Sequence, residues 1–215
     1  ERLGDMPETV RALSIALDNV GRVAEALGQW AEAETAYRES LALMRQQRER
    51  LGDTPETVRD LSIALNNVGR VAEVLGQRAE AETTYHESLA LMRQQREQLG
   101  DTPEIVRALS IALNNVGRAA EALGQWAEAE TAYRESLALM RQQRERLGDT
   151  PETVRDLSVS LDNVGRVAVA LGQRAEARTF YQEALILCRR LDLAFPDNTE
   201  YQKSIQNLES KLKET

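Results

Sequence analysis

The sequence predicts an all-α solenoid of antiparallel helical hairpins that is closed by a C-terminal helix. Two observations carry this prediction: a 48-residue unit recurs almost four times, and the apolar residues within each unit follow helical spacing. Residues 5–52 and 101–148 differ at only four positions, which indicates recent duplication. No segment alternates with the two-residue period of a strand. We therefore expect a linear stack in which each unit packs only on its neighbours.

The units define the expected domain organisation. A Gly-Asp dipeptide closes one unit and opens the next, and the spacing stays constant along the chain. One stack shares one continuous core, so we expect a single domain over residues 1–215. Its predicted repeats cover residues 5–52, 53–100, 101–148 and 149–196, followed by a helix over residues 199–213.

The first half of each unit predicts an amphipathic helix, which we describe for the second unit. Thr54 is suited to cap the helix, Pro55 to occupy its first position, and Glu56 to favour its positive end. Gly76 and Gln77 then end the helix. Its apolar stripe consists of Val58, Leu61, Leu65, Val68, Ala72 and Leu75.

The second half of the unit predicts another helix, from about Arg78 to Leu99. A connection of only two residues forces the two helices to run antiparallel. Gly100 is suited to end the second helix in the left-handed conformation. The predicted inner face consists of Ala81, Tyr85, Ser88, Leu89 and Met92.

The last predicted helix, over residues 199–213, has the composition of a cap. It follows a break at Phe195-Pro196-Asp197-Asn198 and keeps the 48-residue register. We expect its polar outer side to face solvent because a terminal helix has no further neighbour to cover it. Its inner side is expected to carry Ile205, Leu208 and Leu212.

Composition narrows the classes of partner. The formal net charge is −8, which disfavours nucleic acid and anionic membranes because both attract basic surfaces. A basic or neutral protein or peptide fits better, and no cofactor is expected. The sequence has neither a membrane-spanning apolar run nor a hydrophobic leader. The one cysteine, Cys188, is expected to pack as a small apolar residue in a reducing, cytoplasmic compartment. Because Glu1-Arg2-Leu3 repeats Glu49-Arg50-Leu51, we expect a piece of a longer array.

Several positions of the unit resemble the tetratricopeptide repeat. In the second unit these are Asn66-Asn67-Val68-Gly69, Leu75-Gly76, the alanines of residues 79–82, and Tyr85, and the match recurs along essentially the whole chain. The resemblance implies that Gly69 is a close contact between helices. Ala72 replaces the family's bulky aromatic residue and the terminating proline is absent, so the unit exceeds the family's roughly 34 residues. The unit looks closer to kinesin-light-chain-like and long bacterial arrays.

The resemblance also implies a site. In that family the first helices line the concave face of a right-handed superhelix, where an asparagine hydrogen-bonds the backbone of an extended peptide. An asparagine amide both donates and accepts, and arginines nearby suit a carboxylate. Alternatively, these arginines pair with glutamates along or between helices, and the asparagines satisfy helix or loop carbonyls. The matching residues are Asn19, Arg22, Asn67, Arg70, Asn115, Arg118, Asn163 and Arg166.

Catalysis and metal binding have little support in the sequence. His86 is the only histidine, replaces an arginine of the other units, and is expected at an outward, solvated position. With one histidine and one cysteine far apart, neither a nucleophilic pair nor a metal cluster is expected. Trp30 and Trp126 are expected to rest against their own hairpins, although an exposed binding stripe is an alternative. We therefore predict that the chain is not an enzyme.

The predicted function is a protein-interaction scaffold, or the sensor segment of a larger, bacterial-type protein, that binds a peptide or protein in its groove. The alternative is a structural role in which the chain stacks end to end. Near-identical units would make such stacking geometrically easy, and the N-terminal side shows no polar cap. We expect a monomer or weak end-to-end self-association.

Overall fold

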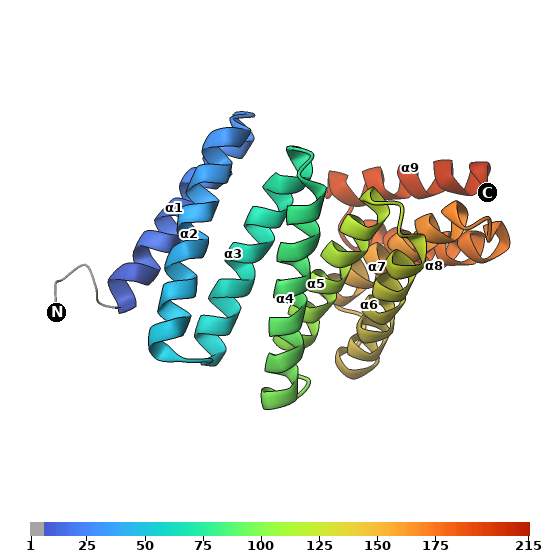
Figure 1. Ribbon diagram of the computed structural model, residues 1–215. Helices are drawn as coiled ribbons and strands as arrows, with labels where there is room; N and C mark the ends of the chain where they lie inside the picture. The colour runs from blue at the N-terminus through green and yellow to red at the C-terminus, as the bar shows by residue number, and fades with distance from the viewer. Residues whose placement is uncertain (1–6) are drawn as a thin grey trace. The chain divides into compact units, whose positions relative to one another are not determined.

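A computed structural model of the chain describes residues 7–215, which form nine α-helices and no strand (Figure 1). The predicted all-α fold is therefore confirmed. The helices are α1 (Pro7–Ala26), α2 (Trp30–Leu51), α3 (Pro55–Val74), α4 (Arg78–Leu99), α5 (Pro103–Ala122), α6 (Trp126–Leu147), α7 (Pro151–Ala170), α8 (Arg174–Ala194) and α9 (Thr199–Glu214). No helix in this part of the chain is both long enough and apolar enough to cross a membrane.

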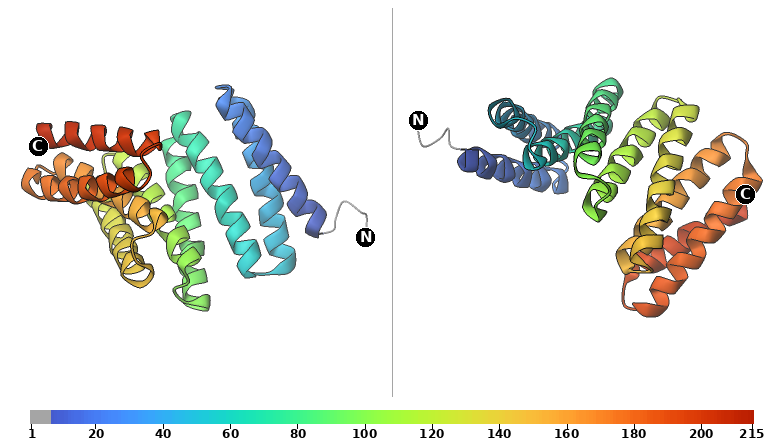
Figure 2. Two further views of the ribbon diagram at one scale, coloured as in Figure 1. Left: turned by 180° about the vertical axis from the view of Figure 1, so that it is seen from behind. Right: turned by 90° about the horizontal axis from the view of Figure 1, so that it is seen from below.

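The helices form two compact units, which divide between Asp101 and Thr102. In the first unit, α1 pairs with α2 and α3 with α4, and α2 packs against α3. In the second unit, α5 pairs with α6 and α7 with α8, α6 packs against α7, and α9 lies on α8 (Figure 2). We number the four hairpins from 1 (α1 and α2) to 4 (α7 and α8).

The two helices of each hairpin meet at a glycine. A Cβ atom at Gly69 would lie only 2.5 Å from Cε1 of Tyr85, whose side chain is fully buried. Gly21 has the same relation to Tyr37, and Gly165 to Tyr181. The glycines are therefore close packing contacts, as the sequence predicted. A buried pair of serine hydroxyls, such as Ser62 and Ser88 at 2.8 Å, lies beside the contact and satisfies its own polar groups.

The helix ends follow the predicted signals. The Thr54 hydroxyl accepts from the backbone N–H of Thr57 at 3.1 Å, and Thr150 caps α7 in the same way. The predicted apolar stripe is wrong at Leu75, which joins Gly76 and Gln77 in the connection between α3 and α4 and is 38% exposed. Gly100 has φ +78°, as expected for a C-terminal glycine, but its ψ of −170° is not left-handed helical. That region is nearly reserved for glycine, because a Cβ atom would clash there.

The C-terminal helix α9 packs as the predicted cap of hairpin 4. Leu208 is buried, whereas Ile205 and Leu212 are half-buried. The Lys211 ammonium donates to Asp162 on α7 at 2.6 Å and lies 5.5 Å from the centre of the Tyr181 ring. The outer side of α9 carries exposed polar residues, including Lys203.

Candidate functional site

The first helix of each hairpin carries three side chains on one face: an apolar β-branched residue, an asparagine four residues later, and an arginine three residues beyond it. They share a face because residues three and four apart lie on the same side of a helix. We call this surface the Asn/Arg face. It comprises Ile15, Asn19 and Arg22 on α1, Ile63, Asn67 and Arg70 on α3, Ile111, Asn115 and Arg118 on α5, and Val159, Asn163 and Arg166 on α7.

Arg70 ties hairpin 2 to hairpin 1. Its guanidinium forms an ion pair with Glu25 on α1 and donates to the Tyr37 hydroxyl at 3.3 Å. The same group donates to Oδ1 of Asn67 at 3.3 Å and lies 5.6 Å from the centre of the Tyr37 ring. Arg70 therefore gains a charge partner and an aromatic partner from the neighbouring hairpin.

The second unit repeats this arrangement around Arg166. Its guanidinium lies 3.1 Å from Glu121, donates to the Tyr133 hydroxyl at 3.2 Å, and donates to Oδ1 of Asn163 at 3.1 Å. It also lies 5.8 Å from the centre of the Tyr133 ring. The recurrence in a separate unit shows that the repeat sequence itself encodes this network between hairpins.

The asparagine amides extend the network to the preceding first helix. Nδ2 of Asn163 donates to Oδ1 of Asn114 at 3.3 Å. Asn67 hydrogen-bonds Asp18, which occupies the position of Asn114 in hairpin 1. Each of these two asparagines thus accepts from its own arginine and contacts the neighbouring hairpin.

Burial sets the electrostatics of the network. Desolvation raises the pKa of Glu121 above its usual range, although the charge of Arg166 opposes this rise. Desolvation, followed by the charge of Glu121, also raises the pKa of Tyr133. Both effects mean that Tyr133 is neutral and donates or accepts as a phenol at physiological pH.

The structure separates the eight predicted site residues into different environments. Arg70 and Arg166 pair with glutamates of the preceding hairpin, which matches the alternative interpretation of the sequence. Asn19 and Arg22 are exposed, and Arg22 donates to Oδ1 of Asn19. On α5, Asn115 is half-buried and Arg118 is exposed.

The apolar members of the Asn/Arg face were not predicted as site residues. Ile15 is 52% exposed, and Ile63 is 47% exposed. The sequence holds a signal for them: Ile63 falls outside the apolar stripe that predicts the core of α3. An isoleucine off that stripe indicates a contact with something other than the hairpin core.

Asp18 is the least satisfied member of the network. Burial raises its pKa, and hydrogen bonds from Ser40 and Asn67 only partly oppose this rise. Among the described residues, its Oδ1 atom has no hydrogen-bond partner. The equivalent residues in hairpins 2 and 3 are Asn66 and Asn114. Ionised Asp18 therefore destabilises the fold relative to an asparagine.

We expect Asp18→Asn to raise the melting temperature at pH 7. A raised folded-state pKa means that stability falls as pH increases from the unfolded-state value, about 4. The advantage of Asp18→Asn should therefore disappear below about pH 3.5. Thermal melts followed by circular dichroism across this range check the prediction. Asp162→Asn is the matched control and should lower the melting temperature, because it loses Lys211. Equal melting temperatures of Asp18→Asn and the parent at pH 7 would contradict it.

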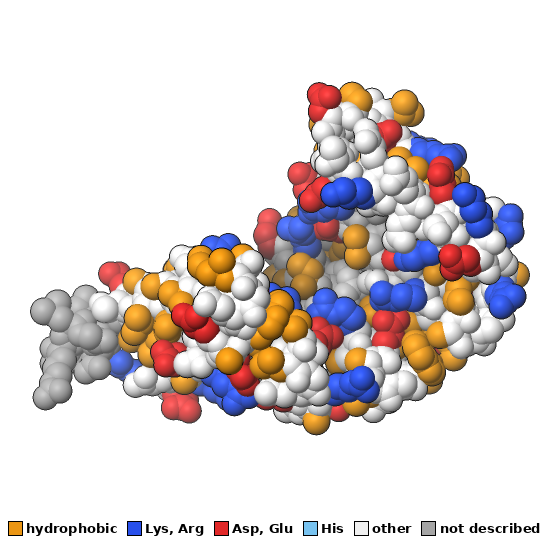
Figure 3. Space-filling model, turned by 90° about the horizontal axis from the view of Figure 1, so that it is seen from above, with side chains coloured by type: hydrophobic (Ala, Val, Ile, Leu, Met, Phe, Trp, Pro, Cys, Tyr) orange, Lys and Arg blue, Asp and Glu red, His pale blue; other side chains and the backbone are white. Residues whose placement is uncertain are grey.

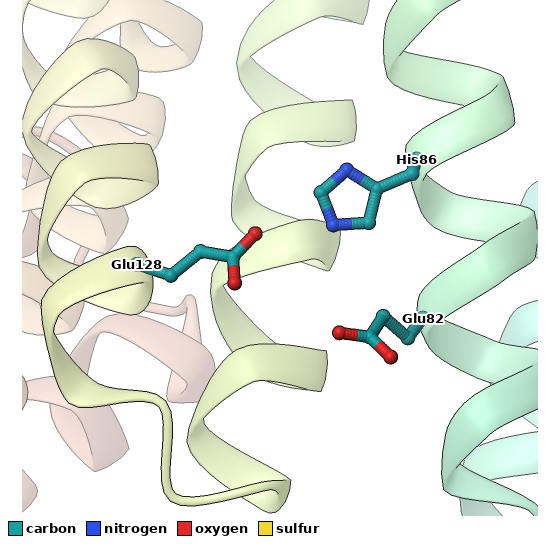
Figure 4. Close-up of side chains that lie close together, drawn as sticks. All are labelled: Glu82, His86 and Glu128. Carbon is teal, nitrogen blue, oxygen red and sulfur yellow. The ribbon is translucent and has the colours of Figure 1, made fainter.

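His86 is the one histidine of the sequence and a candidate metal ligand. His86 is exposed on α4, one turn after Glu82, as Figure 4 shows. Glu128, the third side chain drawn there, belongs to the second unit, and within residues 7–101 no third metal ligand joins His86 and Glu82. The exposed position predicted for His86 is confirmed.

The cysteine packs in the core, and the two tryptophans lie at the starts of second helices. Cys188 is buried, and this burial raises the pKa of its thiol, so it packs as the predicted apolar residue. Trp30 is half-buried at the start of α2, and Trp126 is 38% exposed at the start of α6.

Comparison with known proteins supports one family. The tetratricopeptide repeat family matches residues 60–142 and 108–190, and a second tetratricopeptide repeat model matches residues 16–51. No curated protein sequence matches the chain significantly.

Solved structures share the fold at low sequence identity. BtubC (BKLC) of P. vanneervenii is 17% identical with a TM-score of 0.65, over 99% of this chain and 82% of its own. A Podosopora anserina protein described as a kinesin light chain with nearly identical repeats is 18% identical, with a TM-score of 0.63 over 94% and 95% of the two chains. The apo form of RapI is 13% identical, with a TM-score of 0.66 over 95% of this chain and 54% of its own.

The matched segments together cover well over half of the sequence, and they include the glycine and tyrosine that form each hairpin contact. The family match, the all-α fold and the stacking of hairpins within each unit all indicate the same family. The chain belongs to the tetratricopeptide repeat family.

Proposed function

We propose that the chain is a protein-interaction scaffold that binds an extended peptide or protein segment on its Asn/Arg face. Its family builds scaffolds for protein–protein interaction. The observation that supports this face is the exposed apolar residue on each first helix, one turn before the asparagine. Exposed isoleucines repeated beside amides and guanidinium groups are typical of a binding surface.

Each part of the face suits one part of a peptide. An asparagine amide can donate to a main-chain carbonyl and accept from a main-chain N–H, whatever the peptide's side chain. Ile15 and Ile63 offer apolar contacts to alternate side chains. Arg22 is exposed and suits a carboxylate, whereas Arg70 is partly engaged by Glu25. We infer that a peptide with apolar residues and a carboxylate placed near Arg22 is favoured.

The proposed binding site keeps all eight residues of the predicted ladder: Asn19, Arg22, Asn67, Arg70, Asn115, Arg118, Asn163 and Arg166. The proposal includes no catalytic step and no cofactor. We also propose that the chain works in the cytoplasm of a bacterial-type cell, as a monomer, and that residues 1–215 act as one array.

A peptide selected from a random displayed library against the intact chain tests this proposal. Changing Asn67 and Asn115 to alanine together with Arg70 and Arg118 to glutamine should abolish its binding. Each hydrogen bond contributes about 0.5–1.5 kcal/mol, so one asparagine alone should matter only a few-fold. Binding should also weaken with salt if the arginines meet carboxylates. Fluorescence anisotropy provides the measurement.

Two controls separate binding from folding. Because Arg70 also pairs with Glu25, the variant Glu25→Gln disturbs the same network and should leave peptide affinity nearly unchanged. Circular dichroism should show equal helicity for all variants. The proposal fails if the quadruple variant binds as well as the parent while Trp30→Ala with Trp126→Ala removes binding.

A further inference from the structure

The junctions between hairpins repeat one ion pair within each unit. Figure 3 shows basic and acidic side chains side by side at many places on one face of the molecule. At the junction of hairpins 1 and 2, Arg70 of α3 pairs with Glu25 of α1. At the junction of hairpins 3 and 4, Arg166 of α7 pairs with Glu121 of α5. A first helix therefore supplies the arginine, and the preceding first helix supplies the glutamate.

The junction between hairpin 4 and α9 has lost both members of this pair. Val169 stands at the register position of Glu121 and is 39% exposed. Glu214 of α9 replaces the arginine of the repeat. Desolvation, followed by the charge of Asp162, raises the pKa of Tyr181 to about 12, and the charge of Glu214 also raises it. By register, Glu214 is placed opposite residue 169, and a glutamate there would repel it.

This junction uses a different ion pair, shifted by one helical turn. Lys211 of α9 donates to Asp162 of α7 at 2.6 Å and lies 5.5 Å from the centre of the Tyr181 ring. In the repeat, the register position of Lys211 is an asparagine, and Asn163 donates to Asn114 there at 3.3 Å. The cation has thus moved three residues towards the start of the helix, and its carboxylate partner has moved with it.

Hairpin 1 shows what an aspartate at this position does without a lysine. Asp18 has the register position of Asp162, but the helix packed on it supplies Asn67. Burial raises the pKa of Asp18, and within residues 7–215 its Oδ1 atom has no hydrogen-bond partner. An aspartate at this position therefore favours a helix that brings a cation over one that brings an amide.

The packing contact of the junction changes together with the charges. Across the junction of hairpins 3 and 4, the hydroxyls of Ser136 and Ser160 form a hydrogen bond of 3.2 Å. At the register positions of these serines, α8 carries Ala184 and α9 carries Leu208, and both are buried. A leucine beside an alanine buries apolar surface and leaves no hydroxyl to satisfy.

We propose that hairpin 4 and α9 form a matched pair that excludes first helices of the repeat type. A repeat helix would bring its arginine to Val169, which offers no carboxylate, and its asparagine to Asp162. The face of hairpin 4 that α9 covers is therefore a poor acceptor for a second copy of the chain. This pairing does not depend on peptide binding at the Asn/Arg face. The selecting residues are Asp162, Val169 and Ala184 on hairpin 4, and Leu208, Lys211 and Glu214 on α9.

A cycle of two variants of the intact chain tests the matched pair. The hairpin variant, Asp162→Asn with Val169→Glu, gives hairpin 4 the residues of hairpin 3. The helix variant, Lys211→Asn with Glu214→Arg, gives α9 the residues of a repeat helix. Each should raise the amide exchange rates of α9 several-fold, because each leaves charges without partners. Combining them should return the rates close to those of the parent, since the pairing of the repeat is then complete. Hydrogen exchange with mass spectrometry is the measurement.

A transplanted helix tests the exclusion. Pro151–Arg166 replaces Thr199–Glu214 in this chain, because the two segments have equal length and lie 48 residues apart in register. On the hairpin 4 of the parent, the transplanted helix should exchange rapidly. The hairpin variant should slow its exchange several-fold. As a control, Lys203→Asn in the parent removes an exposed charge of α9 and should leave its exchange unchanged.

Two results would overturn the proposal. If the effects of the two variants simply add, or if neither variant changes the exchange of α9, the charges do not select the helix. If the transplanted helix is equally protected on the parent and on the hairpin variant, hairpin 4 does not exclude repeat helices. Recovery in the combined variant, together with slower exchange of the transplanted helix on the hairpin variant, supports the matched pair.

Discussion

Gly69→Leu is expected to lower the melting temperature of the chain by several degrees. The added Cβ would lie 2.5 Å from Tyr85 and 2.8 Å from Thr84, both buried, so the two helices must separate. Overpacking a close contact costs roughly 1–3 kcal/mol. The better helix propensity of leucine offsets less than about 1 kcal/mol of this loss. In a chain of this size, each kcal/mol shifts the melting temperature by roughly 2–4 °C.

Thermal melts followed by circular dichroism measure this effect. Thr83→Leu is the matched control, because Thr83 is exposed on α4. It should melt at or above the parent temperature. Combining Gly69→Leu with Tyr85→Ala removes the clash and should recover part of the loss. A Gly69→Leu variant that melts at the parent temperature would show that the contact is not close.

Truncation after Leu193 is expected to reduce solubility far more than helicity. Losing α9 removes its 16 helical residues, the buried Leu208, and the contact of Lys211 with Asp162 and Tyr181. Burial of a leucine stabilises by about 1.5–3 kcal/mol. The surface of α8 that α9 covers would become exposed, and such apolar surfaces associate. Static light scattering and the concentration of soluble protein after centrifugation provide the measurement.

The full-length variant Leu208→Asp separates loss of the cap from loss of chain length. It should also reduce solubility, because an unpaired carboxylate cannot stay in a buried position. Lys203→Asp, on the exposed side of α9, should behave as the parent. Equal solubility of the truncated and intact chains would argue against a capping role for α9.

The helices and their inner faces could be predicted because local signals fix them. Thr54 and Pro55 begin α3, and Gly100 follows the end of α4. The apolar stripe of α3 predicts which side of that helix is buried. These signals act within a few residues of the backbone, so one repeat is enough to read them. The outlying Ile63 has no predicted role, because the apolar stripe of a helix predicts only its core-facing residues.

The partners of the arginines could not be predicted from the sequence. Arg70 has Glu73 three residues along its own helix, yet it pairs with Glu25 in the preceding hairpin. Neighbours along a helix and neighbours in the next hairpin lie at similar distances, and the sequence pattern is identical for both. Only the packing of one hairpin on the next selects between them.

The ion pairs between hairpins have a consequence for how such a gene changes length. Arg45 and Glu87 lie 42 residues apart, as do Arg141 and Glu183, and all four copies carry an arginine and a glutamate at these two places. Unequal recombination that inserts or deletes a whole 48-residue copy joins new neighbours whose side chains already match. The number of hairpins can therefore change while each junction keeps its ion pair. Selection can then act on the length of the stack alone.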